Sequence, residues 1–271
     1  MNNRTAPQKP GIGSGDFPAA LQYILMACGL AVLTYESYQA SAAASLITAL
    51  SIALWYWFFC LRQPGCAPLL GLSAFCAGLM IAPASRAIAE YLNDAIMQLA
   101  NGSPIVYLVL RAGLVEELAK FGAAYLTLRF VCPGKGSPQS VFGAVAAAAL
   151  GLAAFETFDK LHSLSDWTWK YTLYSVAMGG LVRIPTHVLL SSMWAACWVM
   201  ASRIRSYHKL LMLPLGLLAA ICFHGLWDLI ASFANQNHLL ALQLLLLYCW
   251  FWFLYARMAS AIRLVERLNE L

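Results

Sequence analysis

The sequence predicts an all-α polytopic membrane protein, with about eight transmembrane helices and an amphipathic interfacial helix between the third and the fourth. Two observations support this prediction. The 271 residues are 61% hydrophobic and only 11% charged, whereas a soluble domain carries about a quarter charged residues. The apolar runs are also as long as the ~20 residues that a helix needs to cross a bilayer.

Eight apolar runs are predicted to span the membrane. They are residues 17–35, 41–61, 66–83, 104–131, 138–160, 171–201, 209–232 and 238–257. Residues 1–16 are polar and rich in Gly and Pro, which predicts a disordered N-terminus and no cleavable signal peptide, so the first span is expected to stay in the protein. The stretch "ASRAIAEYLNDAIMQLA" has apolar residues at helical spacing and charges opposite, as in a helix that lies on a membrane surface.

The basic residues predict the orientation. With the N-terminus in the cytoplasm, eleven Lys and Arg residues fall on the cytoplasmic side and three on the other side, which indicates that both termini are cytoplasmic. The net charge of +5 therefore reflects membrane topology, and no nucleic-acid partner is predicted. The eleven are Arg4, Lys9, Arg62, Arg129, Lys135, Arg203, Arg205, Lys209, Arg257, Arg263 and Arg267, and the three are Arg86, Lys160 and Lys170.

The span 104–131 contains "EELAK", with Glu116, Glu117 and Lys120. Ionisable residues inside a membrane span are costly and usually mark function. Glu116 and Lys120 are four residues apart on one helical face and are expected to pair, while Glu117 is rotated by about 100°. One carboxylate could thus be held by Lys120 while the other acts as a base or a ligand. A purely structural ion pair is the alternative.

The next three spans each add ionisable residues. Glu156 follows the small-residue run "AVAAAALGLAA", and small residues let neighbouring helices approach closely. The span 171–201 contains "RIPTH", in which Arg183 and His187 are four apart and Pro185, between them, is expected to kink the helix. In "HGLWD", His224 and Asp228 share one face, so they can bind one metal, or the aspartate can orient the histidine.

The depth of these residues in the membrane is expected to be similar. At about 1.5 Å per residue, His224 and Glu156 lie in the outer half of a ~30 Å core, and Glu116 and His187 join them if their long spans protrude outward. Carboxylates and histidines form a plausible ligand set for zinc, whose bound water could attack a peptide carbonyl. The same residues could instead form the proton relay of a transporter.

The four motifs "EELAK", "GLAAFE", "RIPTH" and "HGLWD", in this order on successive spans, resemble the PrsW family of intramembrane proteases, which is related to the CAAX prenyl protease and Abi superfamily. The resemblance covers roughly residues 104–232. It departs from the family pattern at Leu152 and Thr157, where an aromatic residue and an asparagine are expected.

The resemblance implies a division of the chain and a set of functional residues. Residues 17–103 would hold three spans and the amphipathic helix, 104–232 the catalytic core, and 233–271 the last span and a cytoplasmic tail. It implies an endopeptidase, metal-dependent or of the glutamic type. The implied catalytic residues are Glu116, Glu117, Lys120, Glu156, His187, His224 and Asp228, and the implied Zn²⁺ ligands are Glu116, Glu156, His187, His224 and Asp228.

The resemblance also implies a substrate and a location. The substrate would be a membrane-anchored protein or peptide, such as an anti-sigma factor cut on its extracytoplasmic side in site-1 cleavage, and the membrane would be a bacterial inner membrane. The alternative function is a proton-coupled transporter that uses the same Glu and His residues. Against a transporter, the sequence contains neither an internal inverted repeat nor a matched pair of broken spans.

Overall fold

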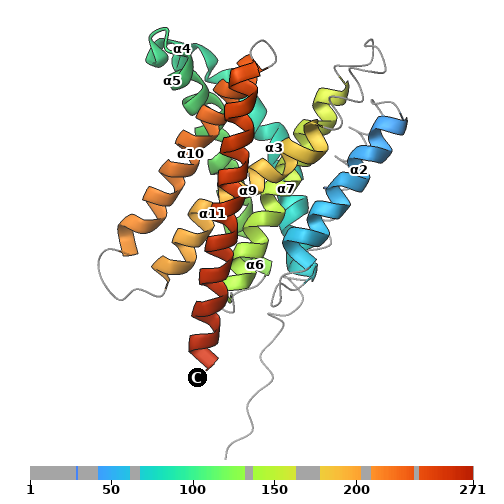
Figure 1. Ribbon diagram of the computed structural model, residues 1–271, viewed down its shortest axis with the longest axis vertical. Helices are drawn as coiled ribbons and strands as arrows, with labels where there is room; N and C mark the ends of the chain where they lie inside the picture. Colours follow the sequence, from blue (N-terminus) through green and yellow to red (C-terminus); the bar gives the residue numbers. More distant parts are fainter. Residues whose placement is uncertain are drawn as a thin grey trace, which may run out of the picture.

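The computed structural model is almost entirely helical in the part of the chain that it describes (Figure 1), which is residue 29 and residues 42–61, 68–131, 137–162, 178–202, 209–234 and 238–270. The all-α prediction is therefore confirmed. The elements are α2 (Ala42–Tyr56), η1 (Trp57–Leu61), α3 (Pro68–Tyr91), α4 (Asn93–Ala100), α5 (Pro104–Leu108), η2 (Val109–Leu114), α6 (Val115–Val131), α7 (Pro138–His162), η3 (Gly179–Arg183), α9 (Ile184–Ala201), α10 (Lys209–Ala234) and α11 (His238–Glu270).

Six helical segments of the described chain are long and apolar enough to cross a membrane. They are Ala44–Leu61, Pro68–Tyr91, Pro138–Leu161, Gly179–Ala201, Leu210–Phe233 and Leu242–Leu264. The expected span 104–131 is also helical along its whole length, but it contains more charged residues than the apolar stretches of these six. The expected disordered segment 1–16 and nearly all of the first span, 17–35, lie outside the described residues, so the total of eight spans stays a prediction.

The segment expected to form one interfacial helix is divided in the structure. Residues 84–91 continue α3, and α4 holds residues 93–100. Asn101 and Gly102 follow with positive φ angles of 47° and 79°, a left-handed conformation that ends helices. The next helix starts with favourable N-terminal residues, because the Ser103 hydroxyl accepts a hydrogen bond from the Val106 amide and Pro104 is a first-turn proline.

Helix α7 lies at the centre of the bundle, against α3 on one side and α9 on the other. Its alanine-rich run from Ala144 to Ala154 is buried, and its glycine allows a close approach to α3. A Cβ atom at Gly151 would collide with the carbonyl oxygen of Phe75, and one at Gly78 with that of Ala148. The small residues of α7 therefore let backbone pack on backbone, as in other membrane bundles.

Two of the π-helical segments lead into helices that carry a predicted motif, α6 and α9. Segment η2 connects α5 to α6, and η3 leads into α9. Such segments occur mostly within α-helices at functional sites. In Figure 1, α4 and α5 lie at one end of the bundle and the C-terminus lies at the other.

Candidate active site

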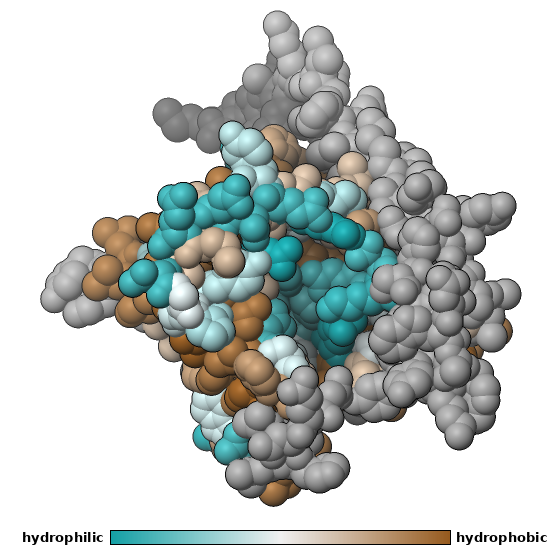
Figure 2. Space-filling view, turned by 90° about the horizontal axis from the view of Figure 1, so that it is seen from above, coloured by the Kyte–Doolittle hydropathy of each residue, from teal (hydrophilic) through white to brown (hydrophobic). Residues whose placement is uncertain are grey.

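A hollow lined by hydrophilic residues opens in the end of the bundle that carries α4 and α5 (Figure 2). It consists of two cavities of about 330 Å³ and about 320 Å³. The first reaches His187 and His224, and the second reaches Arg111. Both cavities are lined by Glu116, Glu156, Lys160 and Asp228, so they form two lobes of one hollow.

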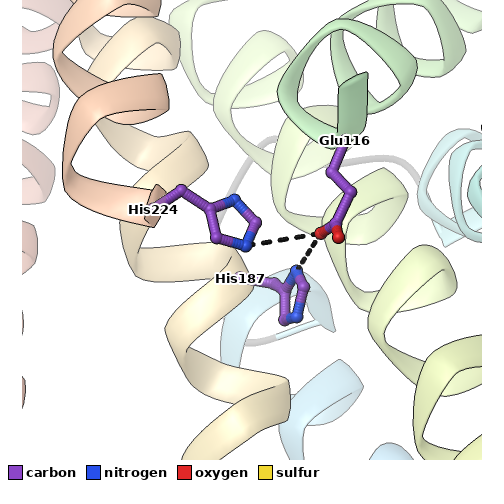
Figure 3. Close-up of side chains that lie close together, drawn as sticks. All are labelled: Glu116, His187 and His224. Carbon is purple, nitrogen blue, oxygen red and sulfur yellow. Dashed lines mark ion pairs between the residues drawn. The ribbon is translucent and has the colours of Figure 1, made fainter. Parts of the chain in front are cut away.

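Three side chains from three helices converge in this hollow (Figure 3). Glu116 comes from the first turn of α6, His187 from α9 and His224 from α10. The Oε2 atom of Glu116 lies 3.3 Å from Nε2 of His224 and 3.7 Å from Nδ1 of His187. Each residue offers one ligand atom, and these three atoms lie within 4.8 Å of one another.

The other ring nitrogen of each histidine contacts a second glutamate, which differs for the two histidines. Nδ1 of His224 lies 3.0 Å from Oε1 of Glu117, and Nε2 of His187 lies 3.2 Å from Oε2 of Glu156. An ionised carboxylate only accepts hydrogen bonds, so each of these ring nitrogens carries the proton. In the neutral imidazoles, the opposite nitrogens, Nε2 of His224 and Nδ1 of His187, present lone pairs toward Glu116.

Lys120 lies close to both glutamates of the pair. Its Nζ atom lies 2.7 Å from Oε1 of Glu117 but 4.0 Å from Oε2 of Glu116. The pairing of Glu116 with Lys120 is thus present as a long ion pair, and Glu117 is the closer partner. Four residues apart is a favourable spacing, but so is three, and the neighbouring helices decide which acid faces the interior.

Glu117 is completely buried and its carboxylate is fully hydrogen-bonded. Lys120 and His224 contact Oε1, while the Ser191 hydroxyl and the Trp194 indole donate to Oε2 at 2.8 Å and 2.9 Å. A carboxylate accepts about four hydrogen bonds, so Glu117 has none left for a water or a substrate. Glu116 is the acid of the pair that lines the hollow.

Sequence analysis missed Ser191 and Trp194. Both lie on α9, and with His187 they follow the spacing i, i+4, i+7, which places three polar groups on one helical face. This pattern within an otherwise apolar span was the signal that could have identified them. It was overlooked because serine and tryptophan, unlike glutamate or histidine, carry no charge.

The remaining predicted residues lie around the hollow. Asp228 lines both lobes, one helical turn from His224, and Arg183 lines the first lobe at the end of η3. Glu156 and Asp228, both expected as metal ligands, contribute no atom to the converging group of Glu116, His187 and His224. Glu156 instead contacts the outer nitrogen of His187.

The converging group has the properties of a metal site. Oε2 of Glu116 and Nδ1 of His187 are buried, yet neither has a hydrogen-bond partner within the described part of the chain. Buried polar atoms are normally satisfied, so these two, which lie 3.7 Å apart, fit a site that binds a cation. Two imidazole nitrogens and one carboxylate oxygen match the His₂Glu ligand set of catalytic zinc.

Comparison with known proteins places the chain in a family. A family model described as PrsW family intramembrane metalloprotease matches residues 67–256, more than two thirds of the chain. No curated protein and no solved structure matched. The match includes Glu116, His187 and His224, and six helices suited to a membrane accompany it. The chain is therefore an integral membrane protein that belongs to the PrsW family of intramembrane metalloproteases.

Proposed function

We propose that the protein hydrolyses a peptide bond of a membrane-associated protein or peptide, with Glu116, His187 and His224 holding a catalytic Zn²⁺ ion. The observation that carries this proposal is the convergence of three ligand atoms within 4.8 Å. Two of these atoms are buried without a hydrogen-bond partner among the described residues. A metal ion at their common point would satisfy both.

The outer carboxylates prepare the histidines for this role. Glu117 and Glu156 fix the tautomers of His224 and His187, as carboxylates commonly do behind zinc-bound histidines. Lys120 compensates the buried charge of Glu117. Glu117 is thus a positioning residue, whereas Glu116 faces the hollow.

The chemistry takes place on the side of Glu116 that faces the hollow. Zinc held by Glu116, His187 and His224 would supply a more acidic water molecule and a polarised substrate carbonyl group. Glu116 has two carboxylate oxygens, so Oε2 can be a ligand while Oε1 accepts the proton of the attacking water. Asp228 lies on the wall of both lobes, where its carboxylate can accept a hydrogen bond from a backbone N–H group of the peptide.

The location of the hollow supports an extracytoplasmic site. The hollow opens at the α4–α5 end, opposite the C-terminus (Figure 1, Figure 2). The bias of basic residues favours a cytoplasmic location for both termini. The substrate would therefore be cut in the outer half of the membrane, and the family resemblance suggests a bacterial inner membrane and a single-span protein such as an anti-sigma factor.

The family match does not favour a transporter as the alternative function. The arrangement of the acids supports the same choice, because Glu117 is saturated by four protein contacts. A relay residue has to exchange protons with its neighbours, whereas this carboxylate is fixed by donors on α6, α9 and α10.

Metal content and peptide cleavage test the proposal together. Wild type, Glu116→Gln, His187→Ala and His224→Ala are purified in detergent without chelators, and zinc is measured by mass spectrometry. Cleavage of a library of single-span peptides is followed by mass spectrometry of the products. We expect about one zinc per chain in wild type, far less in both histidine variants, and no cleavage by any of the three.

The control variant is Asp94→Asn, which removes an exposed acid on α4, outside the two lobes of the hollow. It should retain both zinc and cleavage. A wild-type protein that cleaves peptides after every metal has been removed would contradict the zinc mechanism. It would point instead to a glutamic-type peptidase with Glu116 as the base.

A further inference from the structure

The junction between η3 and α9 contains a proline. The N–H group that it lacks would have bonded one of two backbone carbonyl groups. The last π-type hydrogen bond that closes η3 runs from the Ile184 amide to the Gly179 carbonyl. The next residue, Pro185, has no N–H group to donate. In π-helical register its partner would be the Gly180 carbonyl, and in α-helical register the Leu181 carbonyl.

Each of these two carbonyl groups accepts a side-chain hydrogen bond from another helix. The indole Nε1–H of Trp55, on α2, donates to the Gly180 carbonyl at 2.6 Å. The hydroxyl of Tyr248, on α11, donates to the Leu181 carbonyl at 2.8 Å. In either register, one of the two donors therefore takes the place of the N–H group that proline lacks.

The two donors belong to one aromatic cluster. The ring of Trp252 lies 5.8 Å from that of Trp55 and 6.2 Å from that of Tyr248, measured between centroids. Helices α2 and α11 carry no ionisable residue of the hollow, yet they meet through these rings. The cluster thus fixes both donors relative to each other and to the start of α9.

The junction positions His187. This residue lies two positions after Pro185, in the first turn of α9, and its Nδ1 atom faces Glu116. A carbonyl left without a partner inside a membrane protein is costly, so the backbone would shift to find one. Such a shift at Gly180 or Leu181 would move the first turn of α9 and His187 with it.

We propose that Trp55 and Tyr248 are positioning residues that hold His187 in place by hydrogen-bonding the Gly180 and Leu181 carbonyl groups, one of which lacks the backbone donor that Pro185 cannot supply. This inference rests on the proposed function for its main readout, zinc binding. It assigns a role in the active site to α2 and α11, the expected spans 41–61 and 238–257, which lie outside the core 104–232.

Zinc affinity of a double-mutant set tests the inference. The dissociation constant is measured by competition with a chromophoric chelator for wild type, Tyr248→Phe, Pro185→Ala and the double variant. Residue 185 lies in the α-helix α9, so the N–H group that alanine restores would bond the Leu181 carbonyl four residues back, which then no longer needs the tyrosine. We expect Tyr248→Phe to weaken zinc binding about tenfold, near the lower limit for outer-shell residues. In the Pro185→Ala background the same change should cost less than about twofold.

One further variant tests the second donor, and another is a control for the loss of a tyrosine hydroxyl. Trp55→Phe removes the donor to Gly180 and should weaken zinc binding and alter the visible spectrum of the Co²⁺-substituted protein. Tyr56→Phe is the matched control, because its hydroxyl also donates to a backbone carbonyl, that of Pro68, away from η3. An equal effect of Tyr248→Phe in both backgrounds, or one no larger than that of Tyr56→Phe, would overturn the inference.

Failure of the proposed function can be separated from failure of this inference. If wild type binds no zinc, the zinc proposal fails, and the ¹⁵N resonances of the His187 ring, assigned with His187→Gln, become the readout. We then expect Tyr248→Phe to shift these resonances, Pro185→Ala to restore them in the double variant, and Tyr56→Phe to leave them unchanged. Unchanged resonances in Tyr248→Phe would refute the positioning role even without a metal.

Discussion

Lys120 and Glu117 form an ion pair of 2.7 Å in which neither side chain has any solvent-accessible surface. They are three residues apart on α6, and three donors from α9 and α10 complete the surroundings of the carboxylate. The pair connects the first turn of α6 to both histidine-bearing helices. It therefore contributes to the stability of the core and to the geometry of the site.

Removing the lysine should strongly destabilise the protein. Lys120→Met leaves the Glu117 charge buried without its compensating cation, which costs about 3–5 kcal/mol. We expect a marked fall in the thermal unfolding temperature in detergent. The double variant Lys120→Met with Glu117→Gln should regain part of this loss, because no uncompensated charge remains.

The control for this change lies on the same helix. Arg129 is exposed, and Arg129→Met should alter stability by no more than about 0.5 kcal/mol. Equal unfolding temperatures for Lys120→Met and Arg129→Met would show that the buried ion pair contributes little to folding.

The two adjacent glutamates should respond differently to substitution. Glu116→Gln replaces a ligand atom, and the buried Oε2 atom of Glu116 has no hydrogen-bond partner among the described residues, so the variant should fold normally and lose zinc and activity. Glu117→Gln disturbs four contacts, so it should lower the unfolding temperature and weaken zinc binding by about 10–100-fold through His224. Zinc titration and thermal unfolding of both variants check this. Identical profiles would contradict the division of roles.

The contact between Glu156 and His187 should affect metal binding more than folding. Glu156→Gln removes the acceptor charge behind His187 Nε2 but keeps an acceptor oxygen. We expect zinc affinity to fall by about tenfold, with a smaller change in unfolding temperature than for Glu117→Gln, because Glu156 lines the hollow. Complete loss of bound zinc in this variant would instead identify Glu156 as a ligand.

Substituting alanine at two glycines should affect stability very differently. Gly151→Ala places a methyl group against the carbonyl oxygen of Phe75, so α3 and α7 must separate and the protein should lose several kcal/mol of stability. Gly122→Ala meets only Ile81 Cδ1 at 3.8 Å, so it should be neutral or stabilise α6 by up to about 1 kcal/mol. Thermal unfolding of the two variants measures both. A stable Gly151→Ala protein would contradict the close backbone packing.

Much of the fold follows from local pattern. The helix Pro138–His162 and the expected span 138–160 nearly coincide, because an apolar run bounded by polar loops defines a membrane helix almost by length alone. The end of α3 was harder to predict. Residues 84–91 have amphipathic spacing, but this spacing does not show whether a helix continues from the preceding span or starts anew on the surface.

The sequence alone determined which chemical groups lie on which helices: two acids on one, another acid on the next, and a histidine on each of the two that follow. Only the tertiary structure decided which acid of the pair faces the hollow. Glu116 and Glu117 are adjacent and share almost the same local sequence, so helical periodicity offers Lys120 to both. The donors that select Glu117 are Ser191, Trp194 and His224. They lie more than seventy residues away along the chain, and their positions depend on how α6, α9 and α10 pack.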